Sequence, residues 1–276
     1  MMPLKNPQEA TESSELLCEI KDGVAVLTLN RPEVMNALNE SLGAALSRTL
    51  HTLEFDHAIR CVVITGKGPG FMAGGDVGLF GRSLAMETPQ RQALFHSFIQ
   101  AMHPSIVAIR RMPKPVIASI NGATAGFGMS LMMACDLALC TKSSFFTMAY
   151  AQMGLSPDGG GTFFLPRLVG ARKAMELALL SERITSEEAL RLGLVNKVVE
   201  DESLSLETWK MSDRLARGPT AAYAETKRLI MTSFECELPV QLQKEEIAFA
   251  KSTTSHDFCE AASAFLAKRS PNFTGQ

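Results

Sequence analysis

The sequence lacks the features that mark most membrane, metal-binding and secreted proteins. No apolar run approaches the ~18 residues that a membrane-spanning helix needs. The five histidines form no His-x-x-x-His pair, and the six cysteines form no Cys-x-x-Cys pair, so we expect no metal site and no redox motif. Most cysteines lie in apolar runs, which is typical of reduced, buried thiols in a cytoplasmic protein. The net charge of −2 favours neither nucleic acid nor an anionic membrane as partner.

What the chain does have is enough apolar sequence for one large globular unit. It contains 276 residues, 46% of them hydrophobic and 20% charged. Residues 1–14 are polar and lack the apolar core of a secretion signal, so we expect a flexible tail there. We predict a core over residues 15–200 and a helical C-terminal region over residues 201–276.

Strands alternate with helices along the first two thirds of the chain, which predicts an α/β fold. Short β-branched or apolar runs bounded by turn formers predict the strands. These are Val24–Leu29, Cys61–Thr65, Val116–Ile120, Leu137–Cys140, Phe145–Thr147 and Leu194–Val199.

Capping residues mark several helix ends. Helix starts are expected after Asn39, Thr185 and Ser255, and Gly193 is a natural C-terminal cap. A further helix starts at Thr88–Pro89, and we expect Pro104 to end or kink it.

The segment Pro115–Asp136 is the most informative part of the sequence. A strand meets a glycine-rich turn, Asn121–Gly128, and an apolar helix, Met129–Cys135, follows at once. The first N–H groups of such a helix have no partner within it and can hold an anion. Because no phosphate-loop lysine follows the glycines, the guest we expect is a reacting oxygen that becomes negative.

A second glycine-rich loop, Phe71–Asp76, follows the strand Cys61–Thr65. Two such loops, each at the end of a strand, can direct backbone N–H groups at a common point. This arrangement is an oxyanion hole, in which each donor contributes ~2.7–4 kcal/mol of transition-state stabilisation. The alternative is that both loops are ordinary turns between a strand and a helix.

A third segment, Gly154–Thr162, contains Asp158 followed by three glycines. An aspartate before glycine usually bonds its own backbone in a turn. Three glycines exceed what a turn needs, however, and suggest close packing against a ligand or another backbone. Ser130 is a weak candidate nucleophile, because a serine-hydrolase elbow needs glycine where Met132 stands.

Together these segments resemble the enoyl-CoA hydratase/isomerase (crotonase) superfamily. The motifs are LNRPEVMNALN (Leu29–Asn39), FMAGGD (Phe71–Asp76), KPVIASINGATAGFG (Lys114–Gly128) and GLSPDGGGTFFLPRLVG (Gly154–Gly170), in the order and spacing of that superfamily. The resemblance implies a spiral of ββα units, assembly into trimers or hexamers, and an acyl-CoA thioester as substrate with no separate cofactor.

The resemblance also implies roles for individual residues. The oxyanion hole would consist of the N–H groups of Gly75 and Phe127. Ala37 and Ala73 fall where the family's backbone contacts coenzyme A. In the tail, Lys268 or the adjacent arginine could reach the coenzyme A phosphates, across a subunit interface.

This sequence departs from the hydratases of the family at both catalytic glutamates. Those positions hold Ser130 and Tyr150, neither of which is a carboxylate. Asp158 instead stands where single-aspartate isomerases carry their acidic catalyst, including the oxepin-forming isomerases of phenylacetyl-CoA breakdown. The resemblance therefore favours a double-bond isomerase in which Asp158 takes and returns a proton.

We expect apolar surroundings to raise the pKa of that aspartate towards working pH. Leu155, Phe163 and Phe164 are the neighbours that the sequence suggests. Burial disfavours the charged form of a carboxyl group and so raises its pKa.

Three alternatives remain open at this point. One is an atypical enoyl-CoA hydratase without the glutamate pair. Another is an enzyme like the aryl-CoA dehalogenases, with Asp158 as nucleophile and His103 as base, although Tyr150 stands where those enzymes have tryptophan. The third is an acyl-CoA binding protein without catalytic activity.

Overall fold

The computed structural model describes residues 14–276, so all but the last residue of the predicted tail lies outside the described part. The strands are β1 (Leu16–Lys21), β2 (Val24–Leu29), β3 (Cys61–Gly66), β4 (Gly70–Met72), β5 (Val116–Ile120), β6 (Ala123–Ala125), β7 (Leu137–Thr141), β8 (Phe145–Thr147), β9 (Ile184–Thr185) and β10 (Lys197–Val199). The helices are α1 (Glu40–Phe55), α2 (Val77–Ser83), α3 (Thr88–Arg111), α4 (Phe127–Ala134), α5 (Gly161–Val169), α6 (Ala171–Leu180), α7 (Ser186–Arg191), α8 (Leu204–Ala216), α9 (Thr220–Thr232), α10 (Leu238–Ser252) and α11 (His256–Leu266).

The strands form two sheets, and successive strands are divided between them. One sheet has the order β1-β2-β3-β5-β7-β10 and is parallel apart from its β1–β2 pair. The other has the order β4-β6-β8-β9. A strand of each sheet and then a helix recur as β3-β4-α2, β5-β6-α4 and β7-β8-α5. The predicted α/β fold, a spiral of ββα units, is therefore confirmed.

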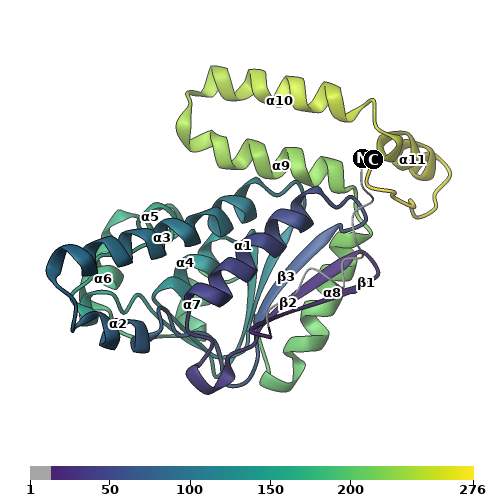
Figure 1. Cartoon of the computed structure of the whole chain (residues 1–276). Helices are drawn as coiled ribbons and strands as arrows, with labels where there is room; N and C mark the ends of the chain where they lie inside the picture. The colour runs from purple at the N-terminus through teal and green to yellow at the C-terminus, as the bar shows by residue number, and fades with distance from the viewer. Residues whose placement is uncertain (1–13) are drawn as a thin grey trace, which may run out of the picture.

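Helices cover both faces of the six-stranded sheet (Figure 1). On β3, Val62 and Ile64 belong to the large apolar core shared with α1, α3 and α4. The alternate residues Cys61 and Val63 belong to a smaller core that includes Leu204 of α8. Because both faces are covered, the strand is apolar throughout rather than alternating, which is why its sequence identified it clearly.

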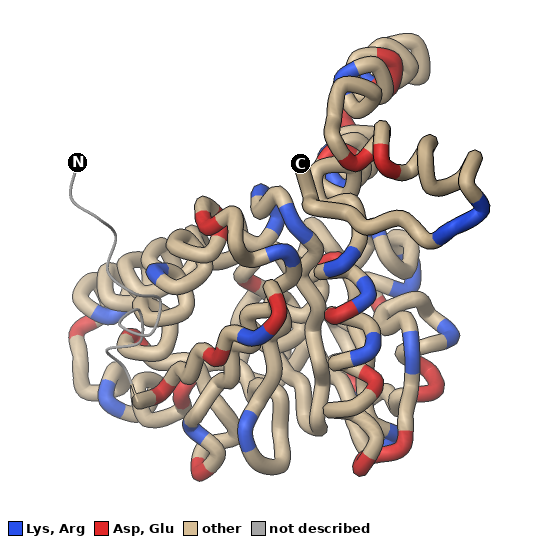
Figure 2. Tube along the Cα trace, turned by 90° about the vertical axis from the view of Figure 1, so that its right-hand side faces the viewer, with Lys and Arg blue, Asp and Glu red and all other residues tan. Residues whose placement is uncertain are grey.

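The last three helices extend away from the two sheets. Figure 1 shows α9 and α10 as an antiparallel pair above the sheets, with α11 at the far end. The side view in Figure 2 shows the same projection and basic and acidic residues interspersed along the chain. Several large apolar side chains of this projection are exposed: Phe234, Leu238, Leu242, Ile247, Phe249, Phe265 and Leu266.

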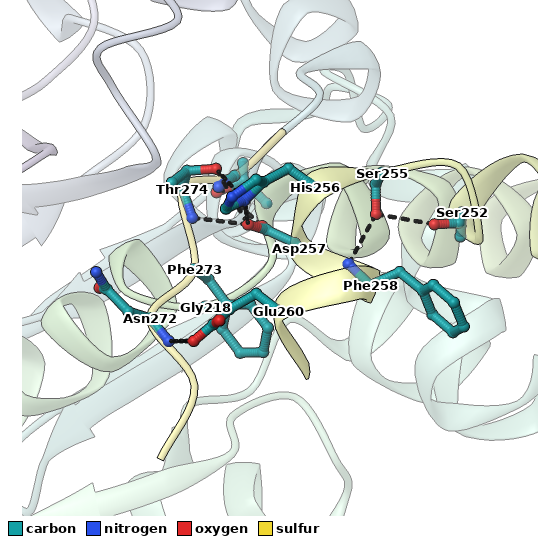
Figure 3. A network of polar contacts seen from close by, with 12 residues as sticks. Gly218, Ser252, Ser255, His256, Asp257, Phe258, Glu260, Asn272, Phe273 and Thr274 are labelled. Atoms are coloured by element: carbon teal, nitrogen blue, oxygen red, sulfur yellow. Dashed lines mark hydrogen bonds and ion pairs between the residues drawn. The ribbon is translucent and has the colours of Figure 1, made fainter. Parts of the chain in front are cut away.

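The final residues are tied back to the molecule by a network around Asp257 (Figure 3). The buried Asp257 carboxylate accepts hydrogen bonds from the backbone N–H groups of Thr274 (2.7 Å) and Gly275 (2.8 Å). Arg60, just before β3, donates to the carbonyl of Phe273 at 3.0 Å. The end of the chain thus joins the start of α11 to the residue that precedes β3.

Most predicted caps are present, with hydrogen bonds to Asn39, Thr185 and Ser255. Two predictions need correction. Of the two effects expected of Pro104, the end of the helix is not observed, because Pro104 lies inside α3, which continues to Arg111. Packing of the later turns into the main core, through Ile106 and Ile109, outweighs the hydrogen bond that proline removes.

The second correction concerns the predicted strand Leu194–Val199. Only Lys197–Val199 pair with a neighbouring strand, β7. Leu194 instead closes the turn after α7, where its N–H donates to the carbonyl of Ala189 at 2.9 Å. Its apolar character reflects burial in that turn and not a place in the sheet.

Across residues 14–276, no helix is both long and apolar enough to cross a bilayer.

Candidate active site

A cavity of about 330 Å³ opens where three irregular segments meet helices α2 and α3. The segments are the loop after β4, the turn before α4, and residues 149–158. Each was selected from the sequence for its glycines or for Asp158. The structure brings the three together around one space.

The first loop presents Gly75 to the cavity. Gly75 forms an isolated parallel bridge with Leu38. The Leu38 N–H donates to Gly74 (2.7 Å), and the Leu38 carbonyl accepts from the N–H of Asp76 (2.9 Å). In a parallel bridge, the residue that lies between these two hydrogen-bonded neighbours directs its own N–H away from the partner strand. The N–H of Gly75 therefore points away from Leu38. Arg31 supports the loop through a 2.8 Å ion pair with Asp76.

The second loop presents the N–H of Phe127, the first residue of α4. Gly126 before it has φ 51° and ψ −121°, a conformation that favours glycine. The first N–H groups of a helix have no intrahelical acceptor. Within residues 14–276 neither Phe127 nor Gly75 donates a backbone hydrogen bond to the protein. Phe127 is buried and belongs to the lining of the cavity.

The two loops touch through their glycines. A Cβ on Gly74 would lie 3.3 Å from the carbonyl oxygen of Ala125, and one on Gly126 would lie 3.4 Å from the Cα of Gly74. This close approach brings the free N–H groups of Gly75 and Phe127 to the same cavity. The arrangement can hold an oxygen that carries negative charge.

Asp158, supplied by the loop before α5, also lines this cavity. Its Oδ1 accepts a 2.5 Å hydrogen bond from the hydroxyl of Tyr150. Burial raises the pKa of Asp158, while the Tyr150 hydrogen bond and the charge of His103 act in the opposite direction. Among the described residues that line the cavity, Asp158 is the only carboxylate.

Tyr150 and Ser130 both donate hydrogen bonds to Asp158, the first to its carboxylate and the second to its backbone carbonyl. Burial is the largest cause of a raised pKa for the Tyr150 phenol, and the negative charge of Asp158 adds to it, so the phenol stays protonated. The hydroxyl of Ser130 donates to the backbone carbonyl of Asp158 at 2.8 Å and lies 3.4 Å from the Tyr150 hydroxyl. Ser130 itself does not line the cavity.

Of the three expected neighbours of Asp158, one shares its cavity. Leu155 lines the same cavity, but Phe163 and Phe164 line a different groove, of about 490 Å³, beside α9. Neither phenylalanine lines the cavity of Asp158, although the Phe164 ring packs against Gly160, two residues further along the chain. Burial is the largest cause of the raised pKa of Asp158.

Helices α2 and α3 supply an apolar part of the cavity lining. It consists of Phe80 of α2 with Phe95, Phe98 and Ile99 of α3. The rings of Phe80 and Phe95 are 5.4 Å apart. From the sequence, the apolar face of α3 was not expected at the site. Its helical spacing could not distinguish a core face from one that also lines a cavity.

The other predicted residues lie at varying distances from this centre. Ala73 lines the cavity, and Ala37 is buried nearby, where its carbonyl accepts a hydrogen bond from Arg31. His103 is exposed and does not line the cavity, although its charge acts on Asp158. Lys268 follows α11, which Figure 1 shows far from α2. Within residues 14–276 no group of three His, Cys, Asp or Glu residues is arranged to bind a metal.

Known proteins are similar to this chain in sequence and in fold over almost its whole length. The profile of the enoyl-CoA hydratase/isomerase family matches residues 19–276. A probable enoyl-CoA hydratase of Rhodobacter capsulatus is 40% identical over 259 residues, covering 94% of this chain and 97% of that protein. The 1,2-epoxyphenylacetyl-CoA isomerase of Escherichia coli is 38% identical over 261 residues, covering 95% and 98%. A crystal structure of an enoyl-CoA hydratase from a Polaromonas species has a TM-score of 0.88 at 37% identity, covering 94% and 99%.

Proposed function

The chain belongs to the enoyl-CoA hydratase/isomerase family, and we propose that it is an isomerase that shifts the double bond of an enoyl-CoA thioester. The observation that carries the proposal is the single carboxylate, Asp158, among the described residues of the cavity. Moving a double bond requires one group that takes a proton and returns it, whereas hydration by a glutamate pair uses two.

In this mechanism the thioester oxygen accepts hydrogen bonds from the N–H groups of Gly75 and Phe127. Both donors are fixed by the backbone before the substrate arrives, so little reorganisation is needed as charge develops. Each donor of this kind is worth ~2.7–4 kcal/mol when the oxygen becomes negative. The stabilised enolate makes the proton next to the thioester easier to remove.

Asp158 then moves the proton. Its carboxylate removes a proton from C2 of a 3-enoyl-CoA, and the electron pair is delocalised onto the thioester oxygen and, through the double bond, onto C4. The same carboxyl group returns the proton to C4, which leaves a conjugated 2-enoyl-CoA and restores the carboxylate. No other reactant is consumed. A pKa above the ordinary aspartate value suits a group that must be both base and acid.

Two observations weigh against the other chemistries. Tyr150 replaces one glutamate, and its raised pKa keeps it a hydrogen-bond donor and not a second base. His103 is exposed outside the cavity lining, a poor position for the base of a dehalogenase. Because relatives include proteins named as hydratases, water addition is the second candidate activity.

The proposal includes an assembly of subunits. Lys268 follows α11, which lies far from α2 of the same chain (Figure 1), so any contact with coenzyme A phosphates would be in a neighbouring subunit. Arg269 already pairs with Glu260 at 2.6 Å, which favours Lys268 for this role. Ala37 and Ala73 would contact the coenzyme near the thioester. The exposed apolar side chains of α10 fit burial in a trimer or hexamer, and the six free cysteines fit a cytoplasmic location.

Incubation of the purified protein with a 3-enoyl-CoA and, separately, with a 2-enoyl-CoA tests the proposal. Chromatography and mass spectrometry distinguish the products. Double-bond migration without a mass change supports the isomerase. A gain of one water from the 2-enoyl-CoA supports a hydratase instead. Tight binding of both esters without turnover would contradict either enzyme and favour a binding protein.

A further inference from the structure

We propose that Tyr150 is a positioning residue, which holds Oδ1 of Asp158 so that Oδ2 faces the acyl group and exchanges the proton. The inference rests on the proposed isomerase function. Its structural basis is the 2.5 Å hydrogen bond from the Tyr150 hydroxyl to Oδ1. Within residues 14–276, no other side chain donates to this carboxylate.

Tyr150 is itself held firmly enough to direct another side chain. Its backbone carbonyl accepts hydrogen bonds from the N–H groups of Met153 (2.9 Å) and Leu155 (3.0 Å), which closes the turn between the tyrosine and the aspartate. Gly154, in the left-handed conformation, makes that turn possible. The tyrosine is buried, with its ring against Gly126 of the second loop. A fixed ring therefore links the Phe127 loop to the carboxylate.

Ser130 does not share this role. Its hydroxyl donates to the backbone carbonyl of Asp158, so it fixes the loop and leaves the carboxylate free to rotate. Besides the backbone of Asp158 itself, the side chains that act on the carboxylate are Tyr150, from the segment before Gly154, and His103, from α3. Tyr150 is the one in direct contact.

The contact has a consequence that a purely structural role would lack. A hydrogen bond donated to a carboxylate favours its charged form, and so lowers the pKa of Asp158 against the effect of burial. Removing the donor raises that pKa and also frees the carboxylate to rotate. Loss of packing alone would reduce activity similarly at every pH.

The test is Tyr150→Phe, which keeps the ring and removes the hydroxyl. We expect the acid limb of the kcat/KM profile to move up by about one pH unit or more, and kcat above that limb to fall about tenfold. The matched control is Tyr223→Phe, which alters the chain's only other tyrosine and lies on α9, outside the cavity. It should keep the wild-type profile.

A second measurement changes the donor without removing it. In the Tyr223→Phe background, 3-fluorotyrosine incorporation places the more acidic phenol at position 150 alone. A stronger donor should move the acid limb below that of the parent, opposite to the effect of Tyr150→Phe. Acid limbs that coincide in the parent and both altered proteins would overturn the proposal.

Carboxyl ¹³C NMR separates this inference from the proposed function. The Asp158 signal is assigned as the one that Asp158→Asn removes, and it is titrated in the wild type and in Tyr150→Phe. A higher pKa in the variant supports the contact even if no tested ester is isomerised, in which case only the proposed function fails. An unchanged pKa overturns the role of Tyr150, whatever the activity.

Discussion

Gly159 lies directly against the ring of Phe127. A Cβ at position 159 would stand 2.8 Å from Cε2 of that ring and 3.0 Å from Cβ of Ser130, and φ at this glycine is +57°. The loop that carries Asp158 is thus packed against the first turn of α4, whose N–H faces the cavity. The sequence suggested close approach to a ligand or backbone, but the neighbours are side chains of α4.

We therefore predict that Gly159→Ala damages catalysis from a position that touches no substrate. The added methyl group must displace Phe127 and occupies an unfavourable φ, which together cost about 1–3 kcal/mol of folding free energy. Movement of Phe127 also misplaces its N–H, so kcat should fall at least tenfold. Thermal unfolding and steady-state kinetics measure the two effects.

Gly193→Ala is the matched control for this variant. Its φ is +75°, but nothing lies within 4 Å of the added Cβ. It should cost about 1 kcal/mol of stability through backbone strain and leave kcat unchanged. Equal losses of kcat in the two variants would mean that contact with Phe127 is irrelevant.

The raised pKa of Asp158 predicts a conflict between stability and function. A carboxyl group whose pKa is higher in the folded state binds its proton more tightly there, so its ionisation destabilises the fold. This destabilisation is absent below the ordinary pKa of 3.8 and complete above the folded-state pKa. Asp158→Asn should therefore raise Tm at neutral pH, and the gain should shrink as the pH falls through the folded-state pKa. A gain that is independent of pH would contradict this.

Ser130→Ala should have little effect on chemistry. The hydroxyl contacts the backbone of Asp158 and not its carboxylate, so kcat should change less than tenfold. Loss of this buried hydrogen bond should cost about 1 kcal/mol of unfolding free energy, measurable by urea denaturation. A hundredfold fall in kcat with an intact fold would give Ser130 a catalytic role.

The network in Figure 3 predicts where the C-terminal segment is anchored. Asp257→Ala leaves the N–H groups of Thr274 and Gly275 without their acceptor and should cost about 1–3 kcal/mol. Hydrogen exchange at these two amides should accelerate. Glu188→Ala, which removes an exposed ion pair with Arg191, should leave both measurements unchanged. Slow exchange in Asp257→Ala would show that other contacts hold the tail.

Much of the fold followed from local sequence because local and tertiary preferences agree. The bounds of β2 and β5 match the prediction, since both strands are apolar runs covered by helices. Strand β1 was missed, because it pairs on one side only and mixes charged with apolar residues. The short strands β4 and β6 lie within glycine-rich stretches that contain too few residues for a periodic signal.

The site followed from sequence only in part, for a similar reason. Glycine spacing and strand order suggested that the loops of Gly75 and Phe127 converge, and the structure brings these loops together. The hydrogen bond from Tyr150 to Asp158 depends on the turn at Gly154 and on the orientation of the buried tyrosine ring. No pattern in one sequence encodes that orientation.

The most direct test of the central claim is Asp158→Asn measured for both turnover and binding. Asparagine keeps the shape of the side chain but cannot take and return a proton. We predict that kcat for conversion of a 3-enoyl-CoA into the 2-enoyl-CoA falls by about 10²–10⁴, while Kd for a non-reacting acyl-CoA stays within a few-fold of the wild type. Unchanged kcat with unchanged Kd would show that another group moves the proton and would contradict the account.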